Sequence, residues 1–271
     1  MTSALNKVIS TDPHCFLSIV GPSGSGKTRL IFELLTFPKI FHPSFDHIVY
    51  FYQHDQPLYT DIATSLKNNI TFVCGVDWEL IGRLPVDKNV KDKLEKIRYL
   101  LVFDDVCEDV AKNVQFNDLA TSGRHRNLHV MFVKHNLYHQ SKFSRTIDLN
   151  TTQIILFKSP RDQEQIRHLG RQLGNSKFLI AAYKDATRAA FGHLLIDLDP
   201  RCNEMLRFCT NITNKTIFYA WKRFDHRHVD SKRRKGDLLR RDEEENEPTV
   251  QSVNDECSKR IYTETFFNFQ I

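Results

Sequence analysis

One stretch of the chain decides the fold, and it runs Phe16-Leu17-Ser18-Ile19-Val20-Gly21-Pro22-Ser23-Gly24-Ser25-Gly26-Lys27-Thr28. The first five residues are mainly apolar and predict a buried strand. The glycine-rich octet 21–28 follows that strand directly, and apolar residues recur at helical spacing after it, up to the helix-stopping Pro38. A strand, a glycine-rich loop ending in Gly-Lys-Thr and a helix, in that order, are the P-loop or Walker A motif. The sequence therefore predicts a P-loop NTPase.

Each part of the octet has a chemical task in this motif. The glycines allow a tight turn whose backbone N–H groups converge on the α and β phosphates, and the start of the helix favours negative charge. The Lys27 ammonium reaches the β and γ oxygens, and the Thr28 hydroxyl binds Mg²⁺. We therefore expect nucleotide contacts from Gly21, Pro22, Ser23, Gly24, Ser25, Gly26, Lys27, Thr28 and Arg29.

The composition is that of a globular protein. Of the 271 residues, 41% are hydrophobic and 26% are charged, and no apolar run approaches the ~20 residues of a membrane span, so we expect no membrane partner. The polar start, Met1 to His14, does not resemble a secretory signal, and the six cysteines include no Cys-x-x-Cys pair. These features favour cytosolic or nuclear residence. The net charge of +5 is compatible with an anionic partner.

Charge and apolar patterning divide the chain into three segments. We expect an N-terminal extension over 1–13, a P-loop ATPase domain over 14–221 and a charged C-terminal tail over 222–271. The tail carries a basic block at 232–235 and an acidic block at 242–245, a composition that predicts disorder. The basic block fits a nuclear import signal or a DNA-tethering arm, and equally a self-neutralising solvated tail.

Apolar runs and helical spacings alternate up to about residue 210. The alternation predicts an α/β fold with a mainly parallel central sheet flanked by helices. We expect strands at Phe16 to Val20, His47 to Tyr52, Ile70 to Cys74, Tyr99 to Phe103, Leu128 to Val133 and Gln153 to Phe157. Helices are expected after the phosphate loop, around Val90, Leu94 and Ile97, from Val106 through Val110 to Val114, and around Ile166, Leu169 and Leu173.

A second motif follows the apolar run 99–103, which ends in Asp104-Asp105. In a chain with a phosphate loop, this pattern is a Walker B strand, in which Asp104 binds Mg²⁺ and Asp105 polarises the water that attacks the γ-phosphate. Taken alone, the pair would fit a helix cap or a turn. The guanine-reading pattern Asn-Lys-x-Asp is missing, because Asn214-Lys215 is followed by Thr216-Ile217. The residues therefore favour ATP as the nucleotide and hydrolysis as the reaction.

Polar residues flank the expected strand at 128–133. At its far end, His135 or Asn136 can hydrogen-bond the attacking water or the phosphate, and the alternative is that they only begin a polar loop. Ahead of the strand stand Arg124 and Arg126, for which the alternative is a solvated loop. Their position favours a subunit edge, from which one guanidinium reaches the γ-phosphate of a neighbouring subunit.

Together these segments resemble a known family. The chain resembles viral genome-packaging ATPases of the FtsK/HerA superfamily, most closely those of Polinton/Maverick-type elements and related DNA viruses of eukaryotes. The resemblance covers about residues 14–212 and rests on the Walker A octet and on Leu101-Val102-Phe103-Asp104-Asp105, Gly123-Arg124-His125-Arg126-Asn127-Leu128, His135-Asn136-Leu137-Tyr138, Leu156-Phe157-Lys158-Ser159-Pro160-Arg161-Asp162, Ala181-Ala182-Tyr183-Lys184-Asp185-Ala186-Thr187 and Gly192-His193-Leu194-Leu195-Ile196-Asp197.

The resemblance implies a RecA/ASCE-like P-loop fold and a homo-oligomeric ring, a pentamer or hexamer, that spends ATP to drive double-stranded DNA into a preformed capsid. A capsid or portal protein is the implied partner. The implied location is the viral assembly site in the host nucleus or cytoplasm, with virion association. A DNA helicase or replication ATPase, and a non-catalytic ATP-binding virion scaffold component, are the alternatives.

The family pattern also assigns roles at individual positions. The family usually has Gln where this chain has His135, so His135 and Asn136 both stay as sensor candidates beside the catalytic candidates Lys27 and Asp105. Arg124 matches the Arg-His pair of the family and is the leading trans-acting arginine. Its rivals are Arg145 and Arg161. For DNA contact we consider Arg167 and Arg171, which lie at i and i+4 on one helix, against the alternative of a solvated face.

Overall fold

The computed structural model describes residues 9–12, 14–37, 39–84, 97–106, 110–138 and 141–220. The expected tail, 222–271, lies outside the described residues, as does most of the expected extension, 1–13. The helix expected around Val90 and Leu94 also falls outside them. Within the described part of the chain, no helix is both long enough and apolar enough to cross a membrane.

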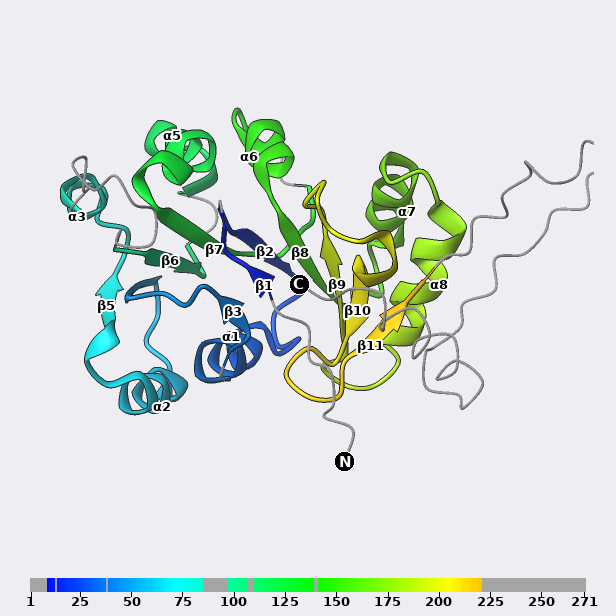
Figure 1. Cartoon of the computed structure of the whole chain (residues 1–271), viewed down its shortest axis with the longest axis horizontal. Helices are drawn as coiled ribbons and strands as arrows, with labels where there is room; N and C mark the ends of the chain where they lie inside the picture. The colour runs from blue at the N-terminus through cyan, green and yellow to red at the C-terminus, as the bar shows by residue number, and fades with distance from the viewer. Residues whose placement is uncertain are drawn as a thin grey trace, which may run out of the picture.

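A nine-stranded sheet forms the centre of the described chain, in the order β11-β10-β9-β8-β2-β7-β6-β4-β5 (Figure 1). Strands β8 to β5 in that order are all parallel, whereas β9, β10 and β11 pair in antiparallel fashion. The expected mainly parallel α/β sheet is thus confirmed. The strands are β2 (Phe16–Val20), β4 (His47–Tyr52), β5 (Ile70–Cys74), β6 (Tyr99–Asp104), β7 (Leu128–Lys134), β8 (Gln153–Phe157), β9 (His193–Asp197), β10 (Phe208–Thr210) and β11 (Ile217–Tyr219), with a separate parallel pair β1 (Ile9–Ser10) and β3 (Phe41–His42).

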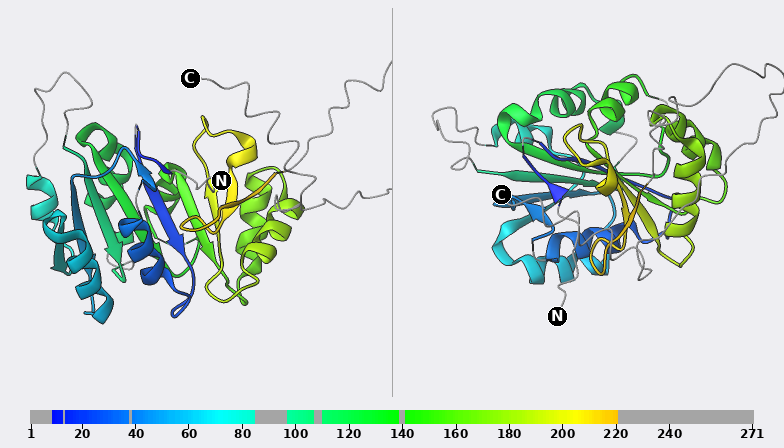
Figure 2. Two further views of the ribbon diagram at one scale, coloured as in Figure 1. Left: turned by 60° about the horizontal axis from the view of Figure 1, so that its bottom comes forward. Right: turned by 45° about the vertical axis from the view of Figure 1, so that its right-hand side comes forward.

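Helices cover both faces of the sheet (Figures 1 and 2). One face carries α1 (Lys27–Thr36) and α2 (Pro57–Leu66), the opposite face carries α5 (Val114–Ser122) and α6 (Ser144–Asn150), and α7 (Gln163–Gln172) and α8 (Ser176–Ala186) lie toward the β9–β11 end. The remaining helices are α3 (Trp78–Arg83) and the 3-10 turns η1 (Lys67–Asn69), η3 (Gly123–Arg126) and η4 (Glu204–Leu206). This is the layered arrangement that alternating strands and helices predict.

The two-sided covering explains why the central strands are apolar throughout. Every residue of β6 is buried, and its side chains alternate between two apolar cores. Leu100 and Val102 pack in the core beneath α1 and α2, whereas Leu101 and Phe103 pack in the core beneath α5. A parallel strand buried on both faces has no reason to alternate apolar with polar residues.

The strand order gathers the predicted functional segments at one edge. Parallel strands end at the same edge of a sheet, so the residues after β2, β6 and β7 are neighbours. Strand β7 lies between β2, which precedes the phosphate loop, and β6, which ends in Asp104. The segment after β7 begins with His135 and is therefore placed between the other two.

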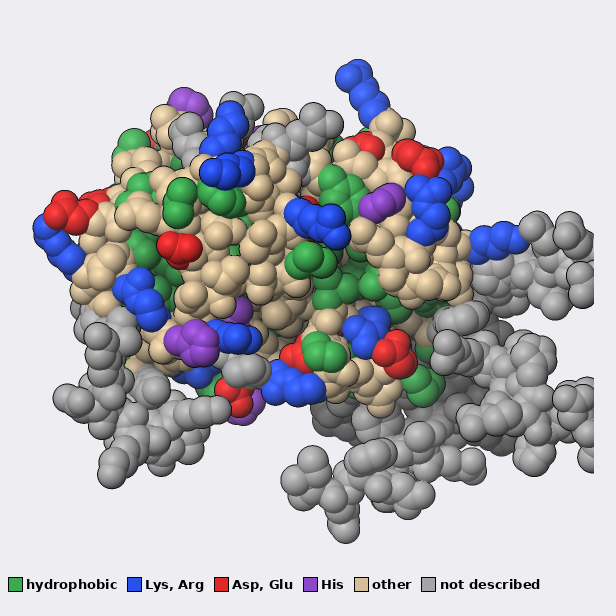
Figure 3. Space-filling view, turned by 90° about the horizontal axis from the view of Figure 1, so that it is seen from above, with side chains coloured by type: hydrophobic (Ala, Val, Ile, Leu, Met, Phe, Trp, Pro, Cys, Tyr) green, Lys and Arg blue, Asp and Glu red, His purple; other side chains and the backbone are tan. Residues whose placement is uncertain are grey.

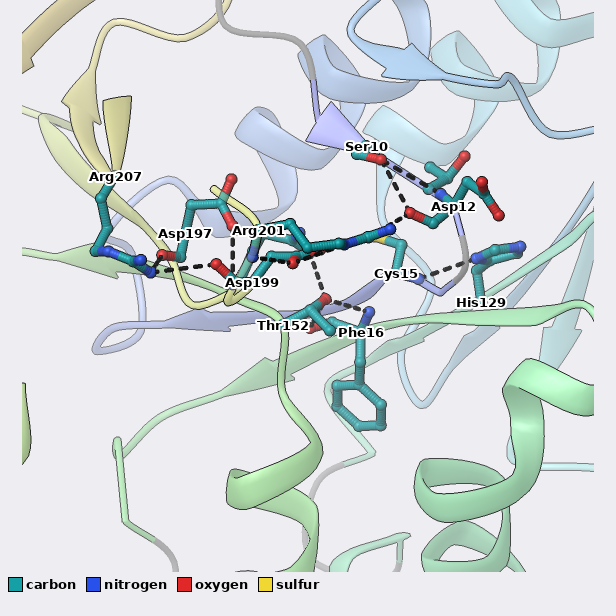
Figure 4. Close-up of polar contacts among 12 residues, drawn as sticks. Ser10, Asp12, Cys15, Phe16, His129, Thr152, Asp197, Asp199, Arg201 and Arg207 are labelled. Atoms are coloured by element: carbon teal, nitrogen blue, oxygen red, sulfur yellow. Dashed lines mark hydrogen bonds and ion pairs between the residues drawn. The ribbon is translucent and has the colours of Figure 1, made fainter. Parts of the chain in front are cut away.

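Hydrogen bonds stabilise the opposite edge of the sheet, where the parallel strands begin (Figure 4). The Cys15 N–H donates to His129 Nδ1 at 3.1 Å, and the Phe16 N–H donates to Thr152 Oγ1 at 2.9 Å. Arg201 donates to the Asp12 carbonyl at 2.6 Å. These contacts tie the segment before β2 to the segments around β7, β8 and β9.

One expected helix is interrupted near its end. The spacing of Val106, Val110 and Val114 predicts a helix over that stretch, and Val110 and Ala111 are helical, with the Val110 N–H donating to the Val106 carbonyl at 3.2 Å, but a separate helix, α5, begins at Val114. The cause is Asn113, whose side chain accepts a hydrogen bond from the Gln115 N–H at 2.7 Å and so caps the helix there. Val106 and Val110 are still apolar core residues, packed in the same cluster as Phe103.

Candidate nucleotide site

The phosphate loop joins β2 to α1 in a conformation that needs its glycines. Gly24 and Gly26 have φ of 74° and 97°, a left-handed region that glycine enters without steric cost. A Cβ on Gly21 would lie 2.6 Å from the Phe157 Cβ, so this position also requires glycine. The loop is therefore a tight turn at the N-terminus of α1, the geometry that presents backbone N–H groups to an anion.

Lys27 lies under this loop rather than in solvent. Its side chain is buried, and its Nζ donates to the carbonyl oxygens of Gly21 at 2.8 Å and Pro22 at 2.9 Å. Burial lowers the pKa of Lys27, whereas the charges of Asp104 and Asp105 act in the opposite direction. The ammonium therefore lies close to the place where the phosphate oxygens of a nucleotide bound in the loop would be.

Asp104 is the centre of a hydrogen-bond cluster. Its Oδ2 accepts from Thr28 Oγ1 at 3.1 Å, from the Tyr50 hydroxyl at 2.7 Å and from the Tyr59 hydroxyl at 3.4 Å. Burial raises the pKa of Asp104, and the hydrogen bonds from Tyr50 and Thr28 lower it. The two tyrosines hold the carboxylate against Thr28, which makes them positioning residues.

Neither tyrosine was predicted as a site residue. Tyr50 stands in the middle of β4, next to β6 in the sheet, and Tyr59 stands on α2. One signal was available, because a tyrosine inside a continuously apolar strand such as 47–52 needs a hydrogen-bond partner for its hydroxyl. The identity of that partner depends on strand order, which the pattern alone does not give.

Thr28 and Asp104 form a donor set that fits Mg²⁺. The ion prefers oxygen ligands and is commonly held by one or two carboxylates together with substrate phosphates and water. A hydroxyl and a carboxylate oxygen 3.1 Å apart, beside the phosphate loop, match that preference.

Asp105 and His135 complete the wall opposite the loop. Asp105 has φ of 59°, a conformation that turns its side chain away from the path of the buried strand, and its carboxylate is 42% exposed. His135 Nε2 lies 3.7 Å from Asp105 Oδ1. Both residues line a cavity of about 410 Å³ that Lys27, Thr28 and Asp104 also line. Five predicted residues from three separate segments therefore meet in one space.

Of the other predicted residues, Ser23, Gly24, Gly26 and Arg29 also line this cavity, whereas Asn136 and the candidate arginines do not. Asn136 is exposed and is not among the residues that line it. Arg124 lies on η3, just ahead of β7, and so at the amino edge of the sheet, away from the phosphate loop. Its neighbour Arg126 donates to the carbonyls of Ile81 and Gly82 at 2.9 and 3.3 Å, which is a structural role. Arg145, in the first turn of α6, and Arg161, ahead of α7, are exposed.

Arg167 and Arg171 project from α7 into an ion-paired surface. Arg167 lies 3.1 Å from Glu164, and Arg171 lies 3.4 Å from the same carboxylate, with every side chain more than half exposed. The face of the molecule drawn in Figure 3 has basic side chains scattered among acidic ones. This geometry matches the solvated-face alternative for the helix pair.

Two kinds of known protein are similar to the chain. The family model of the NB-ARC domain matches residues 1–136, just over half of the 271. The match includes the phosphate loop, Asp104-Asp105 and His135. Among curated proteins, none is similar enough in sequence to match.

The chain is also similar, at low identity and with TM-scores below 0.5, to solved structures of NTPases. The DNA-packaging ATPase B204 from Sulfolobus turreted icosahedral virus has a TM-score of 0.46 and 12% identity, over 69% of this chain and 94% of that one. The genome packaging NTPase B204 from Sulfolobus turreted icosahedral virus 2, in complex with AMPPCP, has a TM-score of 0.44 and 18% identity, over 70% and 96%. ATPases 2 and 3 of EccC from Thermomonospora curvata have a TM-score of 0.39 and 16% identity, over 57% and 32%.

Proposed function

We propose that this chain, which belongs to the NB-ARC domain family, is an ATP-hydrolysing motor that moves double-stranded DNA into a viral capsid. The observation that carries the ATPase part is the convergence of Lys27, Thr28, Asp104, Asp105 and His135 on one cavity beside the phosphate loop. A buried cation, a metal-binding pair and an exposed carboxylate at the end of a buried strand are the parts that phosphoryl transfer to water requires.

Each residue has a distinct role in the proposed hydrolysis. Lys27 and the loop N–H groups bind the β and γ oxygens of ATP, and Thr28 and Asp104 hold Mg²⁺. Bound Mg²⁺ supplies positive charge against the phosphate oxygens as negative charge shifts during the reaction. Asp105 orients the attacking water and accepts its proton, and His135, 3.7 Å from Asp105, is placed to hydrogen-bond the same water or the γ-phosphate.

DNA packaging rests on the sequence resemblance. Three of the segments that carry it, 156–162, 181–187 and 192–197, lie beyond residue 136 and so outside the NB-ARC match. They fall at the end of β8, on α8 and on β9. We therefore assign the motor a capsid or portal partner and a place at the viral assembly site, in the host nucleus or cytoplasm, with virion association.

The trans-acting role proposed for Arg124 requires a neighbouring subunit. Arg124 lies at the opposite edge of the sheet from the cavity of its own chain, so in this proposal its guanidinium acts on the nucleotide of a neighbour. An arginine acting in this way contributes about 10³ to 10⁵ in rate. We accordingly propose a homo-oligomeric ring, a pentamer or hexamer, in which Arg124 is the trans-acting group.

The test is the response of ATP hydrolysis to duplex DNA. A packaging motor hydrolyses ATP on blunt double-stranded DNA without separating the strands, so steady-state phosphate release should rise with blunt duplex and forked DNA should stay paired. Lys27→Ala is the control that should abolish both basal and stimulated turnover. Unwinding of the fork would indicate a helicase instead. Unchanged biological activity of Asp105→Asn would indicate a non-catalytic scaffold component.

A further inference from the structure

A second cavity lies on the other side of the phosphate loop. It has a volume of about 450 Å³ and is lined by loop residues 22–25, by the end of β8 at Phe157 and Lys158, and by residues 188–192, which connect α8 to β9. Ser23 and Gly24 line both cavities. The phosphate loop is therefore the wall that the two spaces share.

Phe191 is the unusual residue of this second cavity. The residue is 69% exposed, although it is large and apolar, and its φ is 60°, a backbone conformation that is unfavourable for a bulky side chain. The ring lies against the phosphate loop, with its Cδ1 3.0 Å from the position that a Cβ on Gly26 would take. An exposed aromatic side chain on an unfavourable backbone conformation, next to the phosphate loop, indicates a functional role for the ring.

The segment that carries Phe191 is held in place by its own hydrogen bonds. Thr187 Oγ1 donates to the Tyr183 carbonyl at 2.7 Å, the Gly192 N–H donates to the Ala189 carbonyl at 3.2 Å, and Arg188 is ion-paired with Asp185. A Cβ on Gly192 would collide with the carbonyl of Ala186, so the chain turns back closely on the end of α8. These contacts hold the segment, and with it the Phe191 ring, in one position beside the phosphate loop.

The direction of a bound nucleotide follows from the first cavity. In the proposed mechanism the γ-phosphate lies beside Asp105 and His135, which line the first cavity, and Lys27 reaches the β and γ oxygens. The nucleoside must then leave the loop on the opposite side, where the second cavity begins at Ser23 and Gly24. An aromatic face beside a phosphate site is suited to a nucleobase, because every base has a π face to stack on it.

We propose that the second cavity binds the nucleoside end of ATP and that the base stacks on Phe191. This inference rests on the proposed ATP binding at the phosphate loop. The basic side chains of Lys158 and Arg188 line the same cavity and suit the α-phosphate end of the nucleotide. Purines should bind more tightly than pyrimidines, because the larger ring system covers more of the Phe191 face.

The experiment compares two ligands that differ in the nucleoside. Equilibrium binding of Mg²⁺-ATP and of Mg²⁺-tripolyphosphate is measured for the wild type, Phe191→Ala, Phe191→Trp and Leu149→Ala. Because stacking contributes about 1 to 3 kcal/mol per base, Phe191→Ala should raise the Kd for ATP by about 5- to 150-fold. Its Kd for tripolyphosphate should stay within about twofold, since that ligand has no base to stack.

Two further variants separate stacking from damage. Phe191→Trp should keep wild-type affinity for ATP because it retains an aromatic face. Leu149→Ala, which removes another exposed apolar side chain from the end of α6, should change neither affinity. Unchanged ATP binding in Phe191→Ala would contradict base stacking on Phe191 and leave the proposed function standing. Equal weakening of both ligands would also contradict base stacking, since the ring would then only support the loop through Gly26. A wild-type protein that binds neither ligand would overturn the proposed function as well.

Discussion

Asp105 and Asp104 are neighbours in sequence with opposite surroundings. Asp104 is buried and accepts three hydroxyl hydrogen bonds, whereas Asp105 has a left-handed backbone conformation and a solvent-accessible carboxylate facing the first cavity. Burial suits a group that holds a metal ion, and access suits a group that handles water. In the proposed mechanism the pair therefore divides Mg²⁺ binding from hydrolysis between two adjacent residues.

Asp105→Asn tests this division. The amide keeps the shape of the side chain but cannot accept a proton, so the rate of ATP hydrolysis should fall by about 10²- to 10⁴-fold, while the Kd for Mg²⁺-ATP stays within about threefold. Single-turnover phosphate release and equilibrium nucleotide binding provide the two measurements. Asp104→Asn is the matched comparison and should lose Mg²⁺-dependent binding. Normal turnover in Asp105→Asn would refute the assignment.

His14 makes the stability of the fold depend on pH. Its ring stacks on His129 at 5.6 Å, neither of its ring nitrogens has a hydrogen-bond partner, and burial, with repulsion from Arg124, lowers its pKa to about 4. Burial also lowers the pKa of His129, to about 3. Between pH 6.5 and about 4 the unfolded chain binds protons that the folded chain does not, so the free energy of unfolding falls as the pH falls.

His14→Phe should remove part of this loss. A histidine whose pKa is 6.5 in the unfolded chain and about 4 in the folded chain lowers the free energy of unfolding by about 2 kcal/mol from pH 7.5 to pH 5. The variant should therefore lose about 2 kcal/mol less than the wild type over that interval. Urea unfolding at the two pH values measures the difference. The phenyl ring retains the stack on His129. Parallel losses in both proteins would show that His14 titrates normally in the folded state.

At the scale of elements, a buried ion pair joins β7 to α6. Lys134, the last residue of β7, has a side chain only 3% exposed, and its Nζ lies 2.7 Å from Asp148 Oδ1. The same ammonium donates to the Leu137 carbonyl at 3.0 Å. The segment between Lys134 and Leu137, which includes His135, is thereby closed into a short loop beside the nucleotide cavity.

Asp148→Ala should destabilise the fold strongly. It leaves the Lys134 ammonium buried without its counter-charge, a change that costs about 3 to 5 kcal/mol. The double variant Lys134→Met with Asp148→Leu removes both charges and should recover most of the loss. Glu79→Ala breaks the exposed pair with Arg83 on α3 and should cost less than about 1 kcal/mol. Urea unfolding of the three variants gives the comparison, and a small loss for Asp148→Ala would contradict the argument.

The predictability of elements followed their burial. The bounds expected for the strands at 16–20, 47–52 and 153–157 are those of β2, β4 and β8, because apolar runs bounded by polar turns mark strands buried in a sheet. Helices α2 and α3 were not predicted. The N-cap position of α2 is Gln56, whose side chain makes no cap hydrogen bond, so α2 lacks a capping side chain. Helix α3 is capped by Asp77 but has only six residues, too few for a long periodic stretch.

The site was predictable where a motif is continuous in sequence and not where it is assembled by folding. Lys27, Thr28, Asp104 and Asp105 belong to two short motifs, and the structure brings them to one cavity. Tyr50 reaches Asp104 only because β4 is the neighbour of β6, and Phe191 reaches the phosphate loop only because β9 follows β8 in the sheet. Strand order is a property of the whole fold, which local periodicity does not contain.

At the scale of the whole molecule, the proposed ring predicts complementation between inactive variants. Arg124→Ala lacks the arginine offered to a neighbour but keeps Asp105, and Asp105→Asn has the opposite defect. A mixed interface that pairs the intact Asp105 of one subunit with the intact Arg124 of the next is complete. An equal mixture should therefore recover up to about a quarter of wild-type ATPase activity, the share of such interfaces in random rings.

The mixing experiment includes its own comparisons. Each variant alone should stay nearly inactive at every protein concentration, whereas the wild type should gain activity steeply as concentration promotes assembly. Arg145→Ala and Arg161→Ala, mixed with Asp105→Asn in the same way, examine the two rival arginines. No recovery with Arg124→Ala, together with recovery with a rival, would move the trans role to that rival. Full activity of Arg124→Ala alone would remove it from the mechanism.

The shared wall at Ser23 and Gly24 has a mechanical consequence. A nucleotide that fills both cavities touches β6 and β7 with one end and the α8–β9 connection with the other, so it bridges the two halves of the sheet across β2. Loss of the γ-phosphate would remove the contacts to β6 and β7, whereas the base would still contact the α8–β9 connection. Hydrolysis would therefore change the contacts on the β6–β7 side of the loop and leave those at Phe191 in place.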